Sequence, residues 1–206
     1  MRTITREYEV YKYNELSDEA KEVAKRWYLG NQNAEVFSDM CKEDLKELFG
    51  RNHTLDVEFS LNYCQGDGFN IYGEVGAEDI FNCLEQHKGG TQLENFENVL
   101  TKEEKKIILN YADDCGKIKL PNNRRYGYCM AHCIDIVNEW EWYLEEDYNK
   151  ELLEKFEDMV KEIFTTLCKG YEEQGYEFFY EIDDEQMEEV CEANDYEFYV
   201  DGKYFY

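Results

Sequence analysis

The feature that most constrains this chain is an acidic segment, residues 139–201, whose apolar residues recur at helical spacing. The segment carries 23 Asp and Glu against 4 Lys, so it holds −19 of the chain's net charge of −26. Regularly spaced apolar positions in so acidic a stretch indicate a helix with one buried stripe and one charged face. We therefore expect a long amphipathic helix from about residue 151, ending at Gly170.

The aromatic content also indicates a folded chain. The 206 residues include 18 Tyr, 12 Phe and 3 Trp, and Pro121 is the only proline. Disordered acidic chains are poor in aromatic residues, and a flexible linker would be rich in Gly, Ser or Pro. We expect a single compact domain over residues 1–206, with an acidic C-terminal subregion, 139–201.

Alternation of apolar and polar residues predicts a small antiparallel sheet and therefore an α+β fold. Residues 55–61 and 69–75 alternate on either side of Gln65-Gly66-Asp67-Gly68, which predicts a central hairpin over residues 54–75. A strand over 126–137 and strands at the N-terminus (6–13) and C-terminus (198–206, turning at Asp201-Gly202) are expected to join it. A helix over 126–137 stays open, and 176–182 is compatible with a short strand.

Several amphipathic helices are expected to pack with this sheet. Their predicted ranges are 18–29 (after an N-cap at Ser17), 34–49, 77–87, 102–111 and 184–192. Asp183 and Gln186 resemble a capping box at the start of the last helix. The segment 117–125, which contains the basic pair Arg124-Arg125, is expected to be a loop.

Few residues suggest catalysis or metal binding. Cys129, His132 and Cys133 lie close together, but zinc sites usually have two ligand pairs, and a strand would direct His132 and Cys133 to opposite faces. Asp67 between two glycines is typical of a turn, although a small-molecule or catalytic role for it stays open. No phosphate-binding loop or HExxH motif is present. We expect no enzymatic activity, no cofactor and no metal.

The N-terminal residues lack an apolar signal-peptide core, and no run approaches the ~18 apolar residues of a membrane span. We therefore expect a cytoplasmic protein that does not bind membranes. In a reducing compartment its eight cysteines are expected to be free thiols.

The net charge of −26 disfavours direct binding to nucleic acid, because affinity for phosphates comes from Lys and Arg. It favours a basic protein partner, although acidity could also serve solubility alone. Carboxylates three or four positions apart on a helix lie ~5–6 Å apart and can imitate a row of phosphates. The candidate partner-binding residues are Glu151, Glu154, Asp158 and Glu162 on the long helix and Asp183, Asp184, Glu185, Glu188 and Glu189 on the short one.

Three stretches carry a family resemblance: YKYNELSDEAKEVAKRWY (11–28), NYCQGDGFNIYGEV (62–75) and NDYEFYVDGKYFY (194–206). Together they resemble small proteins encoded by bacteriophages and prophages of Firmicutes. Acidic proteins of this kind include counter-defence factors such as the anti-CRISPR inhibitors of Cas9. The resemblance implies an inhibitor that binds Cas9 with its guide RNA in the bacterial host and blocks DNA engagement. The alternative is an acidic adaptor or antitoxin-like module that neutralises another basic protein.

Overall fold

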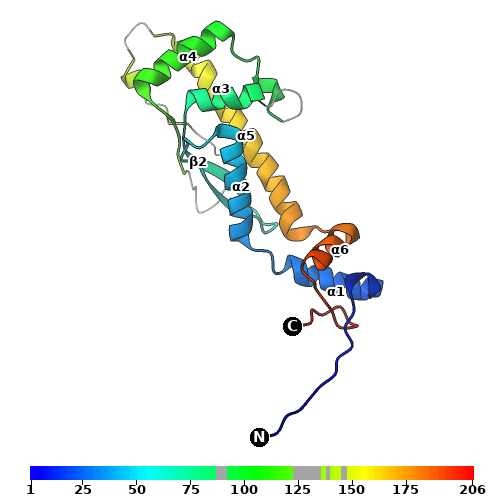
Figure 1. Cartoon of the computed structure of the whole chain (residues 1–206). Coiled ribbons are helices and arrows are strands. Elements are labelled where there is room, and N and C mark those ends of the chain that lie inside the picture. Colours follow the sequence, from blue (N-terminus) through cyan, green and yellow to red (C-terminus); the bar gives the residue numbers. More distant parts are fainter. Residues whose placement is uncertain (87–91, 123–135, 138–139, 145–147) are drawn as a thin grey trace. The chain divides into compact units, whose positions relative to one another are not determined.

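A computed structural model describes residues 1–86, 92–122, 136–137, 140–144 and 148–206 (Figure 1). Within these residues, six α-helices and a small antiparallel sheet confirm the α+β class. Contacts between Cα atoms divide the chain into two compact units. Unit 1 comprises Met1–Ala34 and Gly175–Tyr206, and unit 2 comprises Glu35–Gln174. The single domain over residues 1–206 stays a prediction, and each unit is described by itself.

The sheet belongs to unit 2 and has three strands in the order β1-β2-β3. β1 (Asp56–Ser60) and β2 (Gly68–Val75) form the predicted hairpin, with Val57 opposite Ile71. The third strand, β3 (Ile118–Leu120), pairs with β2 and lies where the sequence predicted a loop. A strand this short leaves almost no alternating pattern in the sequence to detect.

The strand predicted over 126–137 falls almost entirely outside the described residues. Its last residue, Val137, forms an isolated antiparallel bridge with Lys119 of β3. The helix predicted over 77–87 is α3 (Ala77–Gln86), and His87 also lies outside the described residues.

The prediction that the two chain termini add strands to the sheet is wrong. In unit 1 an isolated bridge joins Tyr11 to Phe198, and a second one, between Phe198 and Tyr204, lies within the C-terminal segment. The predicted C-terminal turn is present, with Gly202 at φ +79°. The residues of 6–13 alternate as a strand does, but among the described residues Tyr11 is the only one of them with a bridge partner.

Unit 1 is organised by a short 3-10 helix, η1 (Tyr13–Glu15), together with α1 (Asp18–Leu29) and α6 (Asp184–Ala193). The Ser17 hydroxyl accepts a hydrogen bond from the Ala20 amide at 3.3 Å, which confirms the predicted N-cap of α1. The core of unit 1 consists of Tyr13, Leu16, Ala20, Ala24, Met187, Cys191 and Phe198.

Unit 2 contains most of α2 (Ala34–Phe49), α3, the 3-10 helices η2 (Glu94–Phe96) and η4 (Trp140–Trp142), and α4 (Lys102–Cys115). In Figure 1, α3 and α4 lie beside the first turns of α5 (Lys150–Tyr180). Aromatic rings join these elements, with centroid distances of 5.4 Å for Phe49–Phe164, 5.7 Å for Phe81–Phe156 and 5.2 Å for Phe69–Tyr171.

The apolar residues of the helix predicted over 34–49 are not all buried. Phe37, Cys41, Leu45 and Phe49 of α2 are buried, whereas Val36 and Met40 are about half exposed. The buried residues follow the i, i+4 spacing of one helix face. Val36 and Met40 lie beside that face.

The long helix α5 spans Lys150–Tyr180, so the predictions that it ends at Gly170 and that 176–182 forms a strand are wrong. A glycine inside a helix costs about 1 kcal/mol relative to alanine, and packing outweighs this cost here. The next residue, Tyr171, is 3% exposed and packs on Phe69. A Cβ at Gly170 would lie 3.1 Å from the side-chain oxygen of Gln92, so the glycine permits a close approach within unit 2.

Candidate protein-binding surface on α5

The first half of α5 separates apolar and acidic residues onto two faces, as the sequence predicts. Its buried stripe follows helical spacing and comprises Leu152, Leu153, Phe156, Met159, Val160 and Ile163, none more than 3% exposed. On the outer face, Glu151, Glu154, Asp158 and Glu162 are all exposed. We call these four carboxylates the α5 row.

The structure brings all members of the α5 row to one shallow hollow. This hollow measures about 350 Å³ and is also lined by Val99, Lys155 and Met159. Successive members of the row are three or four positions apart, so neighbouring Cβ atoms lie ~5–6 Å apart. The eleven steps from Glu151 to Glu162, at ~1.5 Å rise each, give a row about 16 Å long that the helix backbone fixes.

Lys155 lies within this acidic hollow, and Glu104 of α4 holds its ammonium group. The Lys155 Nζ atom is 2.8 Å from Glu104 Oε1, while Glu104 Oε2 accepts a hydrogen bond from the Thr101 amide at 2.7 Å. The hydrogen bond from Lys155 is the main reason that the pKa of Glu104 falls to about 2, and the Thr101 backbone adds to it. The pairing with Glu104 partly offsets the positive charge of Lys155 beside the α5 row.

Sequence reasoning missed both Glu104 and Lys155. The spacing Thr101-x-x-Glu104 is a capping box, and the structure has both of its reciprocal hydrogen bonds. This local signal could have identified Glu104 as a helix cap. Its pairing with Lys155, 51 residues away, has no counterpart in sequence spacing.

A second lysine lies at the start of the row. Lys150 Nζ is 3.8 Å from Glu154 and 3.8 Å from Glu141, and all three side chains are well exposed. Exposed pairs at such distances contribute little and are screened by salt. The side-chain carboxylates of Glu151, Asp158 and Glu162 form no hydrogen bond or ion pair with another residue that the structure describes. Three of the four members are therefore not committed to the described part of the fold.

One further acidic residue in the first half of α5, Glu157, differs from the row. Glu157 is half-buried, whereas the four members of the α5 row are exposed. It lies at the edge between the buried stripe and the outer face. The exposed carboxylates therefore form a single narrow row and not a broad acidic face.

The second predicted set of carboxylates, on α6, belongs to unit 1. Asp183 is the N-cap of α6: its carboxylate accepts a hydrogen bond from the Gln186 amide at 2.8 Å, and the Gln186 side-chain oxygen accepts one from the Asp183 amide at 3.2 Å. This confirms the predicted capping box. Asp183 therefore stabilises its own helix.

Asp184 and Glu188 are also engaged inside unit 1. One carboxylate oxygen of Asp184 lies 2.8 Å from the Tyr13 hydroxyl and 2.5 Å from the Lys25 ammonium. The hydrogen bond from Lys25 is the main cause that lowers the pKa of Asp184. Glu188 accepts a hydrogen bond from the Asn14 side chain at 2.8 Å. Tyr13 and Lys25 were not identified from the sequence, because no local pattern links them to α6.

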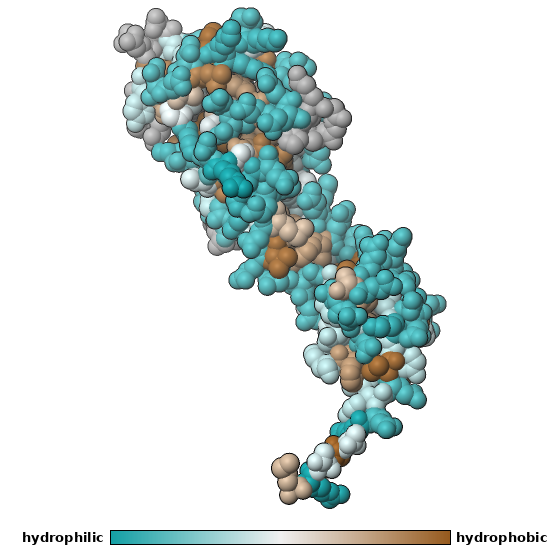
Figure 2. Space-filling model, viewed as in Figure 1, coloured by the Kyte–Doolittle hydropathy of each residue, from teal (hydrophilic) through white to brown (hydrophobic). Residues whose placement is uncertain are grey.

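Two of the five predicted α6 residues, Glu185 and Glu189, are exposed and neither cap the helix nor take part in the bonds described for Asp184 and Glu188. The structure therefore does not present the α6 set as a row comparable to the α5 row. Hydrophilic residues cover most of the face seen in Figure 2, as expected for so acidic a chain.

The QGDG segment is a turn, as predicted. The Asp67 carboxylate accepts hydrogen bonds from the amides of Asn62 at 2.6 Å and Cys64 at 2.9 Å, and from the Ser60 hydroxyl at 3.1 Å. These bonds hold Tyr63 at φ +53°, a left-handed conformation that is uncommon for a tyrosine. Asp67 therefore ties together the loop between β1 and β2.

In the described part of the chain, no three His, Cys, Asp or Glu side chains are grouped to hold a metal ion. Cys129, His132 and Cys133 lie outside that part, as do Arg124 and Arg125. The described cysteines are free thiols. No helix among the described residues is long and apolar enough to cross a bilayer.

Comparison with known proteins gives no relative: no protein-family model, curated protein or solved structure matches this chain.

Proposed function

We propose that this chain is a phage- or prophage-encoded counter-defence protein that binds a basic, nucleic-acid-binding bacterial protein and excludes its DNA. The proposed partner is Cas9 with its guide RNA, in the cytoplasm of the bacterial host, and the proposed mechanism is non-enzymatic. The observation that carries the proposal is the α5 row: exposed carboxylates on a rigid helix, three of them uncommitted within the described fold.

The geometry of the α5 row suits a groove built for phosphates. Its carboxylates follow one another roughly every 5.5 Å along the helix axis, whereas one DNA strand carries a charge every ~3.4 Å of duplex axis. The row is thus sparser than a DNA strand, but the helix backbone fixes its spacing. Preorganised charge loses less entropy on binding than a flexible acidic tail would.

The test is a Cas9 target-DNA cleavage assay with the protein added before or after DNA, over a range of salt concentrations. The test variant is E151Q/E154Q/D158N/E162Q. The matched control, E47Q/E78Q/E103Q/D113N, removes the same charge from exposed positions elsewhere in unit 2. Four exposed ion pairs are worth about 1–4 kcal/mol together, so losing the row should weaken binding roughly fivefold to several-hundredfold.

We expect protection to fail when DNA is already bound, to weaken with salt and to be lost only in the test variant. Equal loss in both variants would show that overall charge, and not the α5 row, is responsible. Wild-type protein that gives no protection would exclude Cas9 as the target. A pull-down that then recovers a small basic toxin encoded nearby would establish the antitoxin-like alternative.

A further inference from the structure

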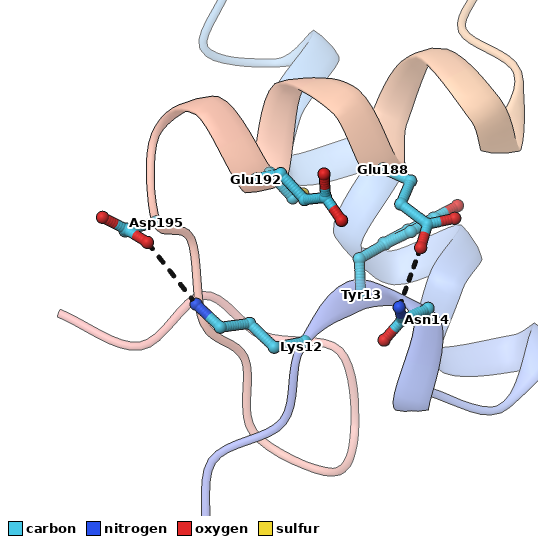
Figure 3. Close-up of a pocket in the computed structure, with 7 residues that line it drawn as sticks. Lys12, Tyr13, Asn14, Glu188, Glu192 and Asp195 are labelled. Atoms are coloured by element: carbon cyan, nitrogen blue, oxygen red, sulfur yellow. Dashed lines mark hydrogen bonds and ion pairs between the residues drawn. The ribbon is translucent and has the colours of Figure 1, made fainter.

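Unit 1 contains a cavity that the proposed function does not use. It lies between η1 and α6, measures about 190 Å³, and is lined by Lys12, Tyr13, Asn14, Glu188, Cys191, Glu192 and Asp195 (Figure 3). Tyr13 and Cys191 are 2% and 3% exposed and form its buried base. The remaining lining side chains are polar or charged. The cavity therefore joins a buried base to a charged rim.

The size of the cavity limits what it can hold. Its volume corresponds to about six water molecules at ~30 Å³ each, below the roughly 300 Å³ at which drug-sized pockets begin. It suits one long amino-acid side chain better than a nucleotide or a folded peptide. The base offers nonpolar contact for a methylene chain, since Cys191 behaves as a small hydrophobe.

The groups at the base support such an occupant. The Tyr13 hydroxyl is already engaged, because it donates to Asp184 outside the lining. The Cys191 thiol forms no hydrogen bond with another described residue, and burial is the main reason that its pKa rises to about 11. Cys191 is thus protonated, and its buried, weakly polar thiol lines the cavity without a hydrogen-bond partner among the described residues.

The rim is negative overall and favours a positive group. Three carboxylates, Glu188, Glu192 and Asp195, face the single cation Lys12. The last turn of α6 contains no basic residue, so its negative dipole end is not compensated from within the helix. Figure 3 shows the Glu192 carboxylate over the space between α6 and η1.

Lys12 lies at the edge of this rim and does not fill the cavity. Its ammonium lies 3.9 Å from Asp195 and 3.7 Å from Glu197, longer than a hydrogen bond, and its side chain is 47% exposed. In Figure 3 the Lys12 side chain extends along the edge toward Asp195. Glu192 forms no ion pair or hydrogen bond with another described side chain.

We propose that this cavity binds one arginine side chain, with the methylenes against Tyr13 and Cys191 and the guanidinium among the carboxylates of Glu188, Glu192 and Asp195. A planar guanidinium can donate two parallel hydrogen bonds to one carboxylate and still has N–H groups for a second, a geometry that a compact ammonium does not offer. Basic proteins that contact phosphates display such arginines. That the arginine belongs to the basic partner rests on the function proposed above, whereas binding of the side chain itself does not.

The test uses NMR titration of the labelled full chain with N-acetyl-L-arginine amide, following the Asn14 side-chain amide and the backbone amides of 188–195. The citrulline analogue, which has the same shape without charge, is the control ligand. A dissociation constant on the order of millimolar is expected for one partly exposed side chain. E192Q/D195N should weaken binding roughly fivefold, and asparagine tolerates the positive φ of Asp195.

Lys12→Gln gives a prediction of opposite sign. Removing the one like charge should strengthen arginine binding about twofold to fivefold. Glu181→Gln, an exposed position of unit 1 outside the lining, should leave it unchanged. Weaker binding of the arginine probe by Lys12→Gln would show that Lys12 supports the probe and does not repel it, and would overturn the proposal. Equal binding of the citrulline analogue, or no shift at the cavity residues, would also overturn it.

The two proposals fail in different ways. If the chain binds the arginine probe in the cavity but inhibits no basic protein, the cavity proposal stands and the proposed function is refuted. A chain that inhibits Cas9 through the α5 row but shows no shift with the probe would lose the cavity proposal alone.

Discussion

Gly202 provides the sharpest test of how unit 1 is packed. It lies in the C-terminal turn at φ +79°, and a Cβ built there would meet the backbone of Ala20 in α1, 2.7 Å from the carbonyl carbon and closer still to its oxygen. Backbone atoms of a helix cannot move aside as a flexible side chain can. Gly202→Ala should therefore force the C-terminal turn away from α1.

The size of the effect follows from two contributions. An alanine in the left-handed region costs about 1–2 kcal/mol, and overpacking against a fixed neighbour costs about 1–3 kcal/mol more. We expect the free energy of unfolding to fall by about 2–5 kcal/mol in total. Gly50 is the matched control: it has φ +74°, but nothing lies within 4 Å of its built Cβ. Gly50→Ala should thus lower the free energy of unfolding only by the cost of the left-handed conformation.

Urea unfolding followed by circular dichroism measures both variants. Hydrogen exchange of the Tyr11 and Phe198 amides, which bond each other's carbonyls at 2.8 and 2.9 Å, reports on unit 1 directly. Faster exchange there in Gly202→Ala is expected. A Gly202→Ala variant no less stable than Gly50→Ala would refute the close approach to α1.

Three further predictions concern single side chains. Asp67→Asn should lower the free energy of unfolding by about 1–2 kcal/mol, measured by urea unfolding, and leave partner binding intact because Asp67 ties a turn. Lys155→Gln should strengthen salt-dependent binding of a basic partner, because it removes the lysine that Glu104 holds beside the α5 row; unchanged affinity would contradict this. Lys25 lowers the pKa of Asp184 below its usual 3.8, so this pair stabilises the fold above that pH and is lost as the pH falls through the lowered pKa. In a carbon-13 NMR titration, Lys25→Met should raise the pKa of Asp184.

Local signals in the sequence determined where most helices begin and how the hairpin forms. Ser17 and Asp183 were identified as N-caps from their residue type and position. In the structure each accepts a hydrogen bond from an amide three positions along the chain. The apolar positions of α5 identified its buried stripe, and through it the exposed α5 row. The QGDG turn followed from its glycines and Asp67. Each of these features depends on residues that are neighbours in sequence.

Only the tertiary structure decided which carboxylates are held by hydrogen bonds or ion pairs within the fold. Asp184 and Glu188 carry the same local pattern of charge as the α5 row, yet Tyr13, Lys25 and Asn14 engage them from the opposite end of the chain. The continuation of α5 through Gly170 was likewise decided by distant packing. A hydrogen bond or ion pair needs two groups within about 3–4 Å. Sequence spacing fixes that distance only within a helix, a hairpin or a turn.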